Sequence, residues 1–158
     1  MKILVAYFSA TGVTGGLAKT IAEVTGGDLF EIKPAAKYST ADLDWQDKNS
    51  RTTKEYNDAN CRPAITEKVP NFEQYNVVFL GFPIWWYEAP RIIQTFVESY
   101  DFSGKTVINF ATSGVSTCEK ADEQLKACCS PQTKWKTGKR FGSFEKSVVK
   151  SWVDGLGL

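Results

Sequence analysis

Residues 3–16 read Ile3-Leu4-Val5-Ala6-Tyr7-Phe8 and then Ser9-Ala10-Thr11-Gly12-Val13-Thr14-Gly15-Gly16. A short apolar run that ends in hydroxyl and glycine residues, before a helical pattern, predicts a strand that leads into a helix N-terminus. Free backbone N–H groups point outward there, and the helix dipole favours an anion. The hydroxyl groups can add donors, and the first glycine lets the backbone approach a ligand closely. Because the stretch contains no lysine or arginine, it predicts a loop that binds a phosphate group through neutral donors.

The spacing of this loop excludes two other nucleotide-binding motifs. A nucleotide-triphosphatase loop ends in Gly-Lys-Ser/Thr, and a dinucleotide-binding loop reads Gly-x-Gly-x-x-Gly. Neither spacing occurs here. The alternative that stays open at this point is an ordinary glycine-rich turn, in which Thr11 caps the helix.

Composition narrows the class of protein. The chain has 158 residues, of which 42% are hydrophobic, which predicts one domain spanning residues 1–158 with a sizeable core. A net charge of +1 argues against a nucleic-acid partner, since such proteins carry a strongly basic domain or stripe. No stretch approaches the ~20 apolar residues of a membrane span, and the first apolar run lacks a leader's cleavage site. We therefore expect no membrane partner and a cytoplasmic location.

The side chains that usually perform acid–base or metal chemistry are scarce. The sequence contains no histidine, which removes the commonest general base and the commonest metal ligand. Its four cysteines form no Cys-x-x-Cys pair and lack the spacing of a zinc site. We therefore expect no metal site and no catalytic side chain, and the chemistry to come from a bound group.

Strand and helix patterns alternate along the chain. Apolar runs predict four buried strands, and a more polar run predicts a fifth strand at an edge of the sheet. The strands are expected at Lys2–Phe8, Asp28–Lys33, Asn76–Phe82, Lys105–Thr112 and Lys134–Phe141. Helices are expected at Thr14–Thr25, Ala89–Tyr100, Glu119–Cys128 and Ser143–Leu156.

This alternation predicts an α/β fold with a doubly wound parallel sheet of five strands, in the order 2-1-3-4-5, and helices on both faces. In that order, the strand sequence reverses between the first and third strands, and ligands bind at the carboxyl ends of the strands at such a point. The loops after Phe8 and Phe82 should therefore face one ligand.

A polar insert at about residues 34–70 interrupts the alternation. Connections of this length are either functional loops or disordered segments. Trp45 and Tyr56 favour an ordered segment, and the stretch from Ser50 to Tyr56 predicts a short helix capped by Ser50.

The loop after the third predicted strand is aromatic, reading Pro83-Ile84-Trp85-Trp86-Tyr87-Glu88-Ala89-Pro90. Three adjacent aromatic side chains cannot all point into the core, because side-chain direction changes along an extended segment. A flat heterocycle is a natural partner for the exposed faces. The alternative is that two of the rings anchor the core and one tyrosine lies on the surface.

Three loops together resemble the flavodoxin family. The stretch Ser9–Thr14 is similar to the loop that holds the FMN phosphate in flavodoxins, and Gly81–Trp86 and Thr112–Ser116 are similar to the segments beside the flavin. The polar insert is similar to that of one branch of the family. The resemblance covers essentially the whole chain and implies a flavodoxin-like fold with FMN as cofactor.

The resemblance also implies the residues of the site. It assigns the phosphate to Ser9, Ala10, Thr11, Gly12, Val13 and Thr14. It assigns the isoalloxazine ring to Pro83, Ile84, Trp85, Trp86 and Tyr87, and its pyrimidine side to Thr112, Ser113, Gly114 and Val115.

The sequence departs from the family pattern in two respects. Flavodoxins commonly place a glycine beside the flavin, where this chain reads Trp86-Tyr87-Glu88, and a left-handed conformation costs a non-glycine residue roughly 1–2 kcal/mol. Electron-carrier flavodoxins are typically strongly acidic, which steers them to basic partners, whereas this chain is near neutral.

Three functions compete. The first is an FMN-binding electron-transfer protein that moves electrons between redox proteins. The second is an NAD(P)H-dependent reductase of quinones or nitro compounds, with a small-molecule electron acceptor. The third, a flavin-free signalling domain, needs acidic residues after the first and third strands, where Phe8-Ser9 and Phe82-Pro83 stand instead.

Overall fold

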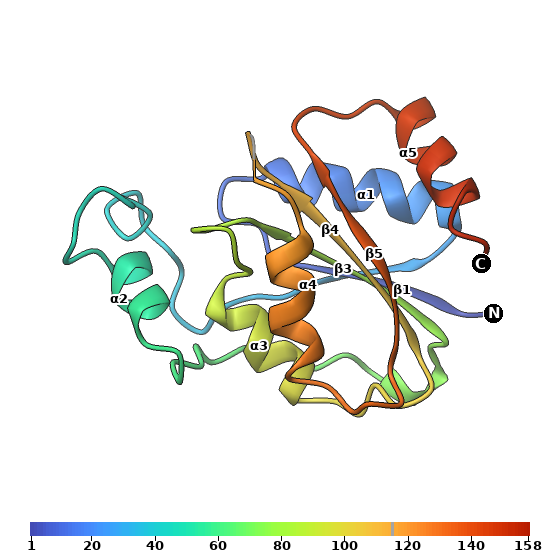
Figure 1. Cartoon of the computed structure of the whole chain (residues 1–158), viewed down its shortest axis with the longest axis horizontal. Helices are drawn as coiled ribbons and strands as arrows, with labels where there is room; N and C mark the ends of the chain where they lie inside the picture. Colours follow the sequence, from blue (N-terminus) through green and yellow to red (C-terminus); the bar gives the residue numbers. More distant parts are fainter. Residues whose placement is uncertain (115) are drawn as a thin grey trace.

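The computed structural model describes residues 1–114 and 116–158. Five parallel strands form one sheet in the order β2-β1-β3-β4-β5, which confirms the predicted order (Figure 1). The strands are β1 (Ile3–Tyr7), β2 (Asp28–Glu31), β3 (Val77–Pro83), β4 (Thr106–Thr112) and β5 (Lys134–Phe141). Each strand falls within or beside its predicted range.

Helices connect the strands as expected. They are α1 (Val13–Thr25), α2 (Arg51–Asn57), α3 (Arg91–Glu98), α4 (Glu119–Lys126) and α5 (Lys146–Asp154), and a short 3₁₀ turn spans Phe72–Gln74. Helices α3, α4 and α5 are shorter than their predicted ranges. The helix expected from Ala89 begins at Arg91, because Pro90 disfavours helical geometry at the residue before it. Over the described residues, no helix is both long enough and apolar enough to cross a membrane.

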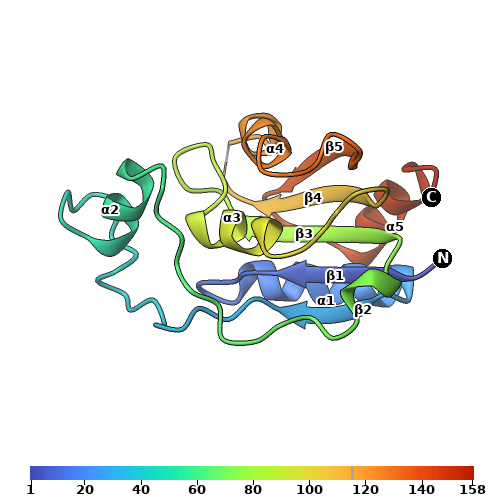
Figure 2. The same cartoon turned by 90° about the horizontal axis from the view of Figure 1, so that it is seen from below.

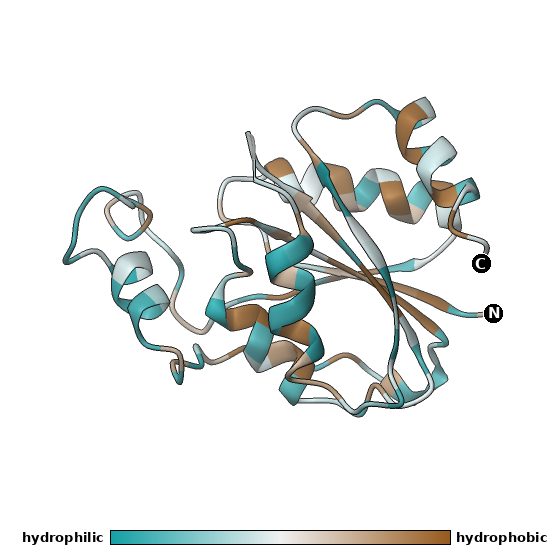
Figure 3. Cartoon of the chain, in the orientation of Figure 1, coloured by the Kyte–Doolittle hydropathy of each residue, from teal (hydrophilic) through white to brown (hydrophobic). Residues whose placement is uncertain are grey.

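Both faces of the sheet are covered by helices. Helices α1 and α5 pack on one face, and α3 and α4 pack on the other (Figures 1 and 2). The central strand β3 is buried along almost its whole length, as its unbroken apolar run predicts. Apolar colour accordingly runs along the central strands, whereas α4 is mostly hydrophilic on its outer side (Figure 3).

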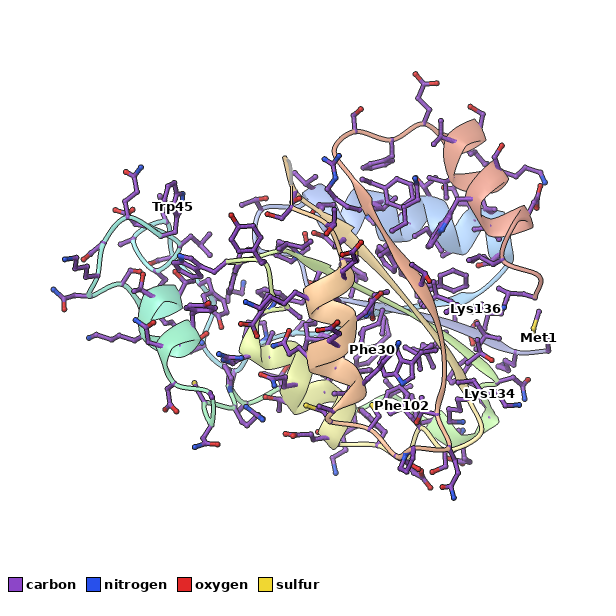
Figure 4. The ribbon with its side chains drawn as sticks, viewed as in Figure 1. Met1, Phe30, Trp45, Phe102, Lys134 and Lys136 are labelled. Atoms are coloured by element: carbon purple, nitrogen blue, oxygen red, sulfur yellow. The ribbon has the colours of Figure 1, made fainter. Side chains whose placement is uncertain are left out.

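The edge strand β5 carries a series of basic residues. Lys134 and Lys136 lie toward the end of the sheet that is remote from the insert (Figure 4). Lysine on an edge strand opposes pairing with another chain, because a strand added at that edge would lie against the lysine charge. This basic segment therefore has a structural explanation at the sheet edge.

The polar insert is ordered and contains the predicted short helix. The hydroxyl of Ser50 caps α2 by accepting the Thr53 N–H at 3.3 Å, which confirms the predicted cap. In both views the insert extends beyond the carboxyl ends of the strands, on the side away from the two termini (Figures 1 and 2). Buried Arg91 holds it there by donating to the carbonyl oxygens of Glu55 and Tyr56, at 3.2 and 2.6 Å.

Candidate functional site

Three loops meet at the carboxyl edge of the sheet, because β1, β3 and β4 are neighbours in it. Hydrogen bonds tie their beginnings together: Phe8 N–H donates to the Gly81 carbonyl at 2.9 Å, and Ile84 N–H donates to the Thr112 carbonyl at 3.1 Å. The predicted convergence of the loops after Phe8 and Phe82 is therefore confirmed, and the loop after β4 joins them.

The first loop turns into α1 through a left-handed glycine. Gly12 is the N-cap residue, with a φ of 96°, and its position has open space around it. The Ser9 hydroxyl accepts the N–H groups of Gly12 and Gly15 at 3.0 and 3.1 Å. The alternative in which Thr11 caps the helix is therefore wrong, since the turn places a glycine at the cap and leaves Thr11 exposed.

The backbone of this loop is of a kind that can bind an anion. A left-handed residue followed by helical residues directs successive N–H groups into one concavity. Thr11, Gly12 and Val13 are exposed, so their backbone is accessible to a ligand from solvent. Thr14 differs from these three residues, since it is buried and its Oγ1 lies 2.8 Å from the Oγ1 of Thr112. Its side chain thus connects the first loop to the third.

The second loop is a tight turn with an unusual backbone. The N–H groups of Trp85 and Glu88 donate to each other's carbonyl oxygens at 3.0 and 3.1 Å. Trp86 and Tyr87 between them adopt positive φ angles of 49° and 69°. Such turns favour Asn-Gly, and strained residues of this kind cluster at ligand sites. The missing glycine of the family pattern therefore does not prevent the left-handed conformation here.

Aromatic contacts hold this strained turn. The ring of Trp86 stacks on Tyr56 of the insert, with centroids 4.9 Å apart. Trp85 packs edge-on against Phe8 and Tyr38, at 5.8 and 5.6 Å. Tyr87 is 62% exposed, so the arrangement combines two anchored tryptophans with one surface tyrosine.

All three aromatic residues nevertheless line one cavity of about 530 Å³. This volume lies within the ~300–1,000 Å³ typical of small-molecule sites. The predicted residues along its wall are Ile84, Trp85, Trp86, Tyr87, Ser113 and Gly114. Ser116, from the segment that resembles those beside the flavin, also lines the wall, and sequence reasoning missed the wall residues Leu43, Trp45 and Thr52. Leu43 and Trp45 could have been predicted, because they are the apolar residues of the otherwise acidic stretch Asp42-Leu43-Asp44-Trp45.

The other predicted residues that the structure describes are not among those that line this cavity. Pro83 and Thr112 end the two strands that lead into it. Ser9 and Ala10 line a second cavity of about 600 Å³, whereas the predicted residues from Thr11 to Thr14 line neither of these two cavities. The expectation for Val115 falls outside the described residues.

Arg140 of β5 holds the third loop. Its Nη1 donates to the carbonyl oxygens of Ser113 and Gly114, at 3.1 and 2.7 Å. The Ser113 hydroxyl donates to the Ser116 carbonyl at 2.7 Å. The fold brings Arg140 to this loop from β5, which pairs with β4.

Comparison with known proteins agrees with this arrangement. The sequence model described as Flavodoxin matches residues 2–156. The chain belongs to the flavodoxin family. No curated protein sequence matches this flavodoxin.

Solved structures extend the comparison. A protein from Bacteroides eggerthii DSM 20697, assigned as a flavoprotein, is 46% identical, with a TM-score of 0.93 over 99% of this chain and 98% of its own. Another from Bacteroides uniformis ATCC 8492, also assigned as a flavoprotein, is 48% identical, with a TM-score of 0.92 over 97% of both chains. A flavoprotein from Lactobacillus acidophilus NCFM, solved in complex with FMN, is 21% identical over 99% of both chains, with a TM-score of 0.73, and shows the shared fold.

Tyr38 connects the insert of this flavodoxin to the site. Its hydroxyl donates to Glu55 Oε1 at 2.5 Å, and Arg51 Nε donates to Glu55 Oε2 at 2.8 Å. The Arg51 guanidinium lies 3.7 Å from the centre of the Tyr38 ring. Burial, and then the hydrogen bond to Glu55, raise the pKa of the Tyr38 phenol well above its usual value.

This raised pKa predicts a loss of stability at alkaline pH. Above about pH 10 the unfolded chain loses the Tyr38 proton while the folded chain keeps it, so stability present below that pH is lost as pH rises. Between pH 8 and about pH 11, the wild type should lose about 1 kcal/mol more than Tyr38→Phe, which retains the ring. Urea unfolding at both pH values measures this difference. Equal losses in the two proteins would show that Tyr38 is not the group responsible.

Proposed function

We propose that this flavodoxin binds FMN across the three loops and uses the bound cofactor to transfer electrons. The observation that carries the proposal is that a left-handed glycine turn at a helix N-terminus and an aromatic cavity lie at the same edge of the sheet. Membership of the flavodoxin family supports it, as does the FMN complex of the Lactobacillus acidophilus protein.

The first loop and the aromatic turn are expected to contribute differently to FMN binding. Hydrogen bonds to a charged group contribute roughly 1.5–3 kcal/mol each, so the first loop should supply most of the affinity. An aromatic contact contributes roughly 0.5–1.5 kcal/mol beyond the area that it buries. The Trp85–Tyr87 turn should therefore orient the flavin and shift its potential more than it raises the affinity.

Bound FMN would supply the redox chemistry, in keeping with a sequence that contains no histidine. The role of the protein is to hold the flavin ring against apolar side chains and to limit the access of water to it. Ile84 and Trp85 contribute to that wall, and Arg140 keeps the loop of Ser113 in place through its carbonyl oxygen.

A second candidate is a reductase of small molecules on the same scaffold. The insert favours it, because Leu43, Trp45 and Thr52 form part of the cavity wall. A protein partner would have to approach the flavin past this segment, whereas a small acceptor could enter the cavity. The near-neutral net charge of +1 also gives little steering toward a charged protein partner.

The test is to load the purified protein with FMN and add NADPH or NADH without oxygen. A yellow complex whose visible flavin band bleaches rapidly would establish a nicotinamide-dependent reductase. A band that persists until dithionite is added would favour a carrier that receives its electrons from a redox protein. Failure to form a yellow complex would overturn the FMN proposal itself.

A further inference from the structure

The wall of the 530 Å³ cavity, where the flavin ring is proposed to bind, includes residues from outside the three loops. Leu43, Trp45 and Thr52 belong to the insert and lie on the same cavity wall as Tyr87. Trp45 projects from the insert at the end of the molecule away from both termini (Figure 4). Its side chain is 65% exposed, which leaves a large aromatic face without full cover from the described residues.

The segment that carries Trp45 is held in place. Ser39 N–H donates to Asp42 Oδ2 at 2.9 Å, and Asp42 N–H donates back to the Ser39 hydroxyl at 3.1 Å. Thr52 N–H donates to the Asp42 carbonyl at 3.1 Å and joins this turn to α2. The exposed face of Trp45 is therefore presented by an anchored turn.

The charges around this wall indicate which ligands it accepts. None of the described residues that line the cavity is charged. The adjacent residues 42–51 carry three aspartates against Lys48 and Arg51, and Arg51 pairs with Asp42 at 4.0 Å, which leaves the segment with one net negative charge. A ligand with phosphate or sulfonate groups would find no countercharge on the wall and a net negative segment beside it.

We propose that Leu43, Trp45 and Thr52, together with Tyr87, bind an uncharged planar aromatic electron acceptor such as a naphthoquinone. This proposal rests on the proposed function, since the acceptor would lie beside the flavin in the shared cavity. Trp45 and Tyr87 offer aromatic faces to the ring system, and Leu43 contributes an apolar contact. The Thr52 hydroxyl is available on the same wall for a ring oxygen.

The experiment measures binding to the oxidised, FMN-loaded protein by equilibrium dialysis. The oxidised flavin and an oxidised quinone do not react, so binding is observed without turnover. The two probes are menadione, an uncharged naphthoquinone, and a naphthoquinone sulfonate with the same ring system and one negative charge. FMN affinity is measured first for each variant, which separates failure of the cofactor site from failure of the acceptor site.

We expect the wild type to bind menadione at least about tenfold more tightly than the sulfonate. Trp45→Ala should weaken menadione binding about tenfold, and Trp45→Phe should restore most of it, because the phenyl ring retains an aromatic face. Asp44→Asn with Asp47→Asn should narrow the difference between the two probes. These changes keep the oxygens that accept the Gln46 and Asn49 N–H groups at 3.0 and 2.8 Å.

A matched control is Val148→Ala, which truncates an exposed apolar side chain on α5, away from the insert. It should leave menadione binding unchanged. Equal menadione affinity in the wild type and Trp45→Ala, with FMN bound in both, would overturn the acceptor site and leave the cofactor proposal intact. Equal affinity of the wild type for both probes would overturn the assignment of an uncharged ligand.

Discussion

Replacing Gly81 with alanine is expected to destabilise the protein by about 3 kcal/mol, at the upper end of the usual cost of overpacking a core. A Cβ atom at this position would lie 2.1 Å from Cε2 of Phe110, which is fully buried on the neighbouring strand. Neither strand can move aside, because β3 and β4 are paired along their length at the centre of the sheet. Thermal unfolding should show a midpoint lowered by roughly 6–12 °C.

Two further variants identify the clash as the cause. Gly16→Ala makes the same change inside α1, where the added atom would meet Phe144 at an ordinary 3.5 Å. It should stabilise the helix by roughly 0.5–1 kcal/mol. In a Phe110→Leu background, the Gly81→Ala change should cost clearly less, since the smaller side chain leaves room. An unchanged cost in that background would contradict the packing explanation.

The double variant Thr11→Ala with Thr14→Ala is expected to weaken FMN binding at least about tenfold, or about 1.4 kcal/mol. Thr11 is exposed beside the left-handed Gly12, where its hydroxyl can donate to the phosphate. Thr14 is buried and joins the first loop to the third through the hydroxyl of Thr112. Loss of the Thr14 hydroxyl should also weaken the contact between the first loop and the third loop, which follows β4. Titration of flavin fluorescence measures the affinity.

Riboflavin, which lacks the phosphate, provides the sharpest control for this variant. The wild type should prefer FMN to riboflavin, and the double variant should lose much of that preference while its riboflavin affinity changes less. Thr20→Ala makes the same substitution on α1, where the hydroxyl donates to the Gly16 carbonyl at 3.2 Å, and should leave FMN affinity unchanged. An unaltered preference for FMN in the double variant would refute the phosphate-loop assignment.

Much of the site could be predicted from local patterns. The apolar run that ends at Phe8 and the run Val77–Phe82 specify buried parallel strands. Their order then places the loops after them at one edge. The helix capped by Ser50 was also predictable, because a cap depends on neighbouring residues in the chain.

Other features depend on contacts between distant segments. The left-handed turn of Trp86 and Tyr87 opposes local propensity, and its neighbours, among them Tyr56 of the insert, hold it in place. Arg140 reaches the third loop only because β5 pairs with β4. Trp45 reaches the cavity only because contacts of Arg91 and Tyr38 hold the insert against the rest of the chain.

The sequence by itself determined the alternation of strands and helices, the sheet order that this alternation implies and the glycine-rich turn after β1, since these follow from periodicity along the chain and from turn chemistry. The tertiary structure alone decided how the insert closes one side of the cavity and which strained turn faces it. These depend on side-chain contacts such as that between Tyr56 and Trp86, which bring together residues far apart in the sequence and can outweigh local backbone preference.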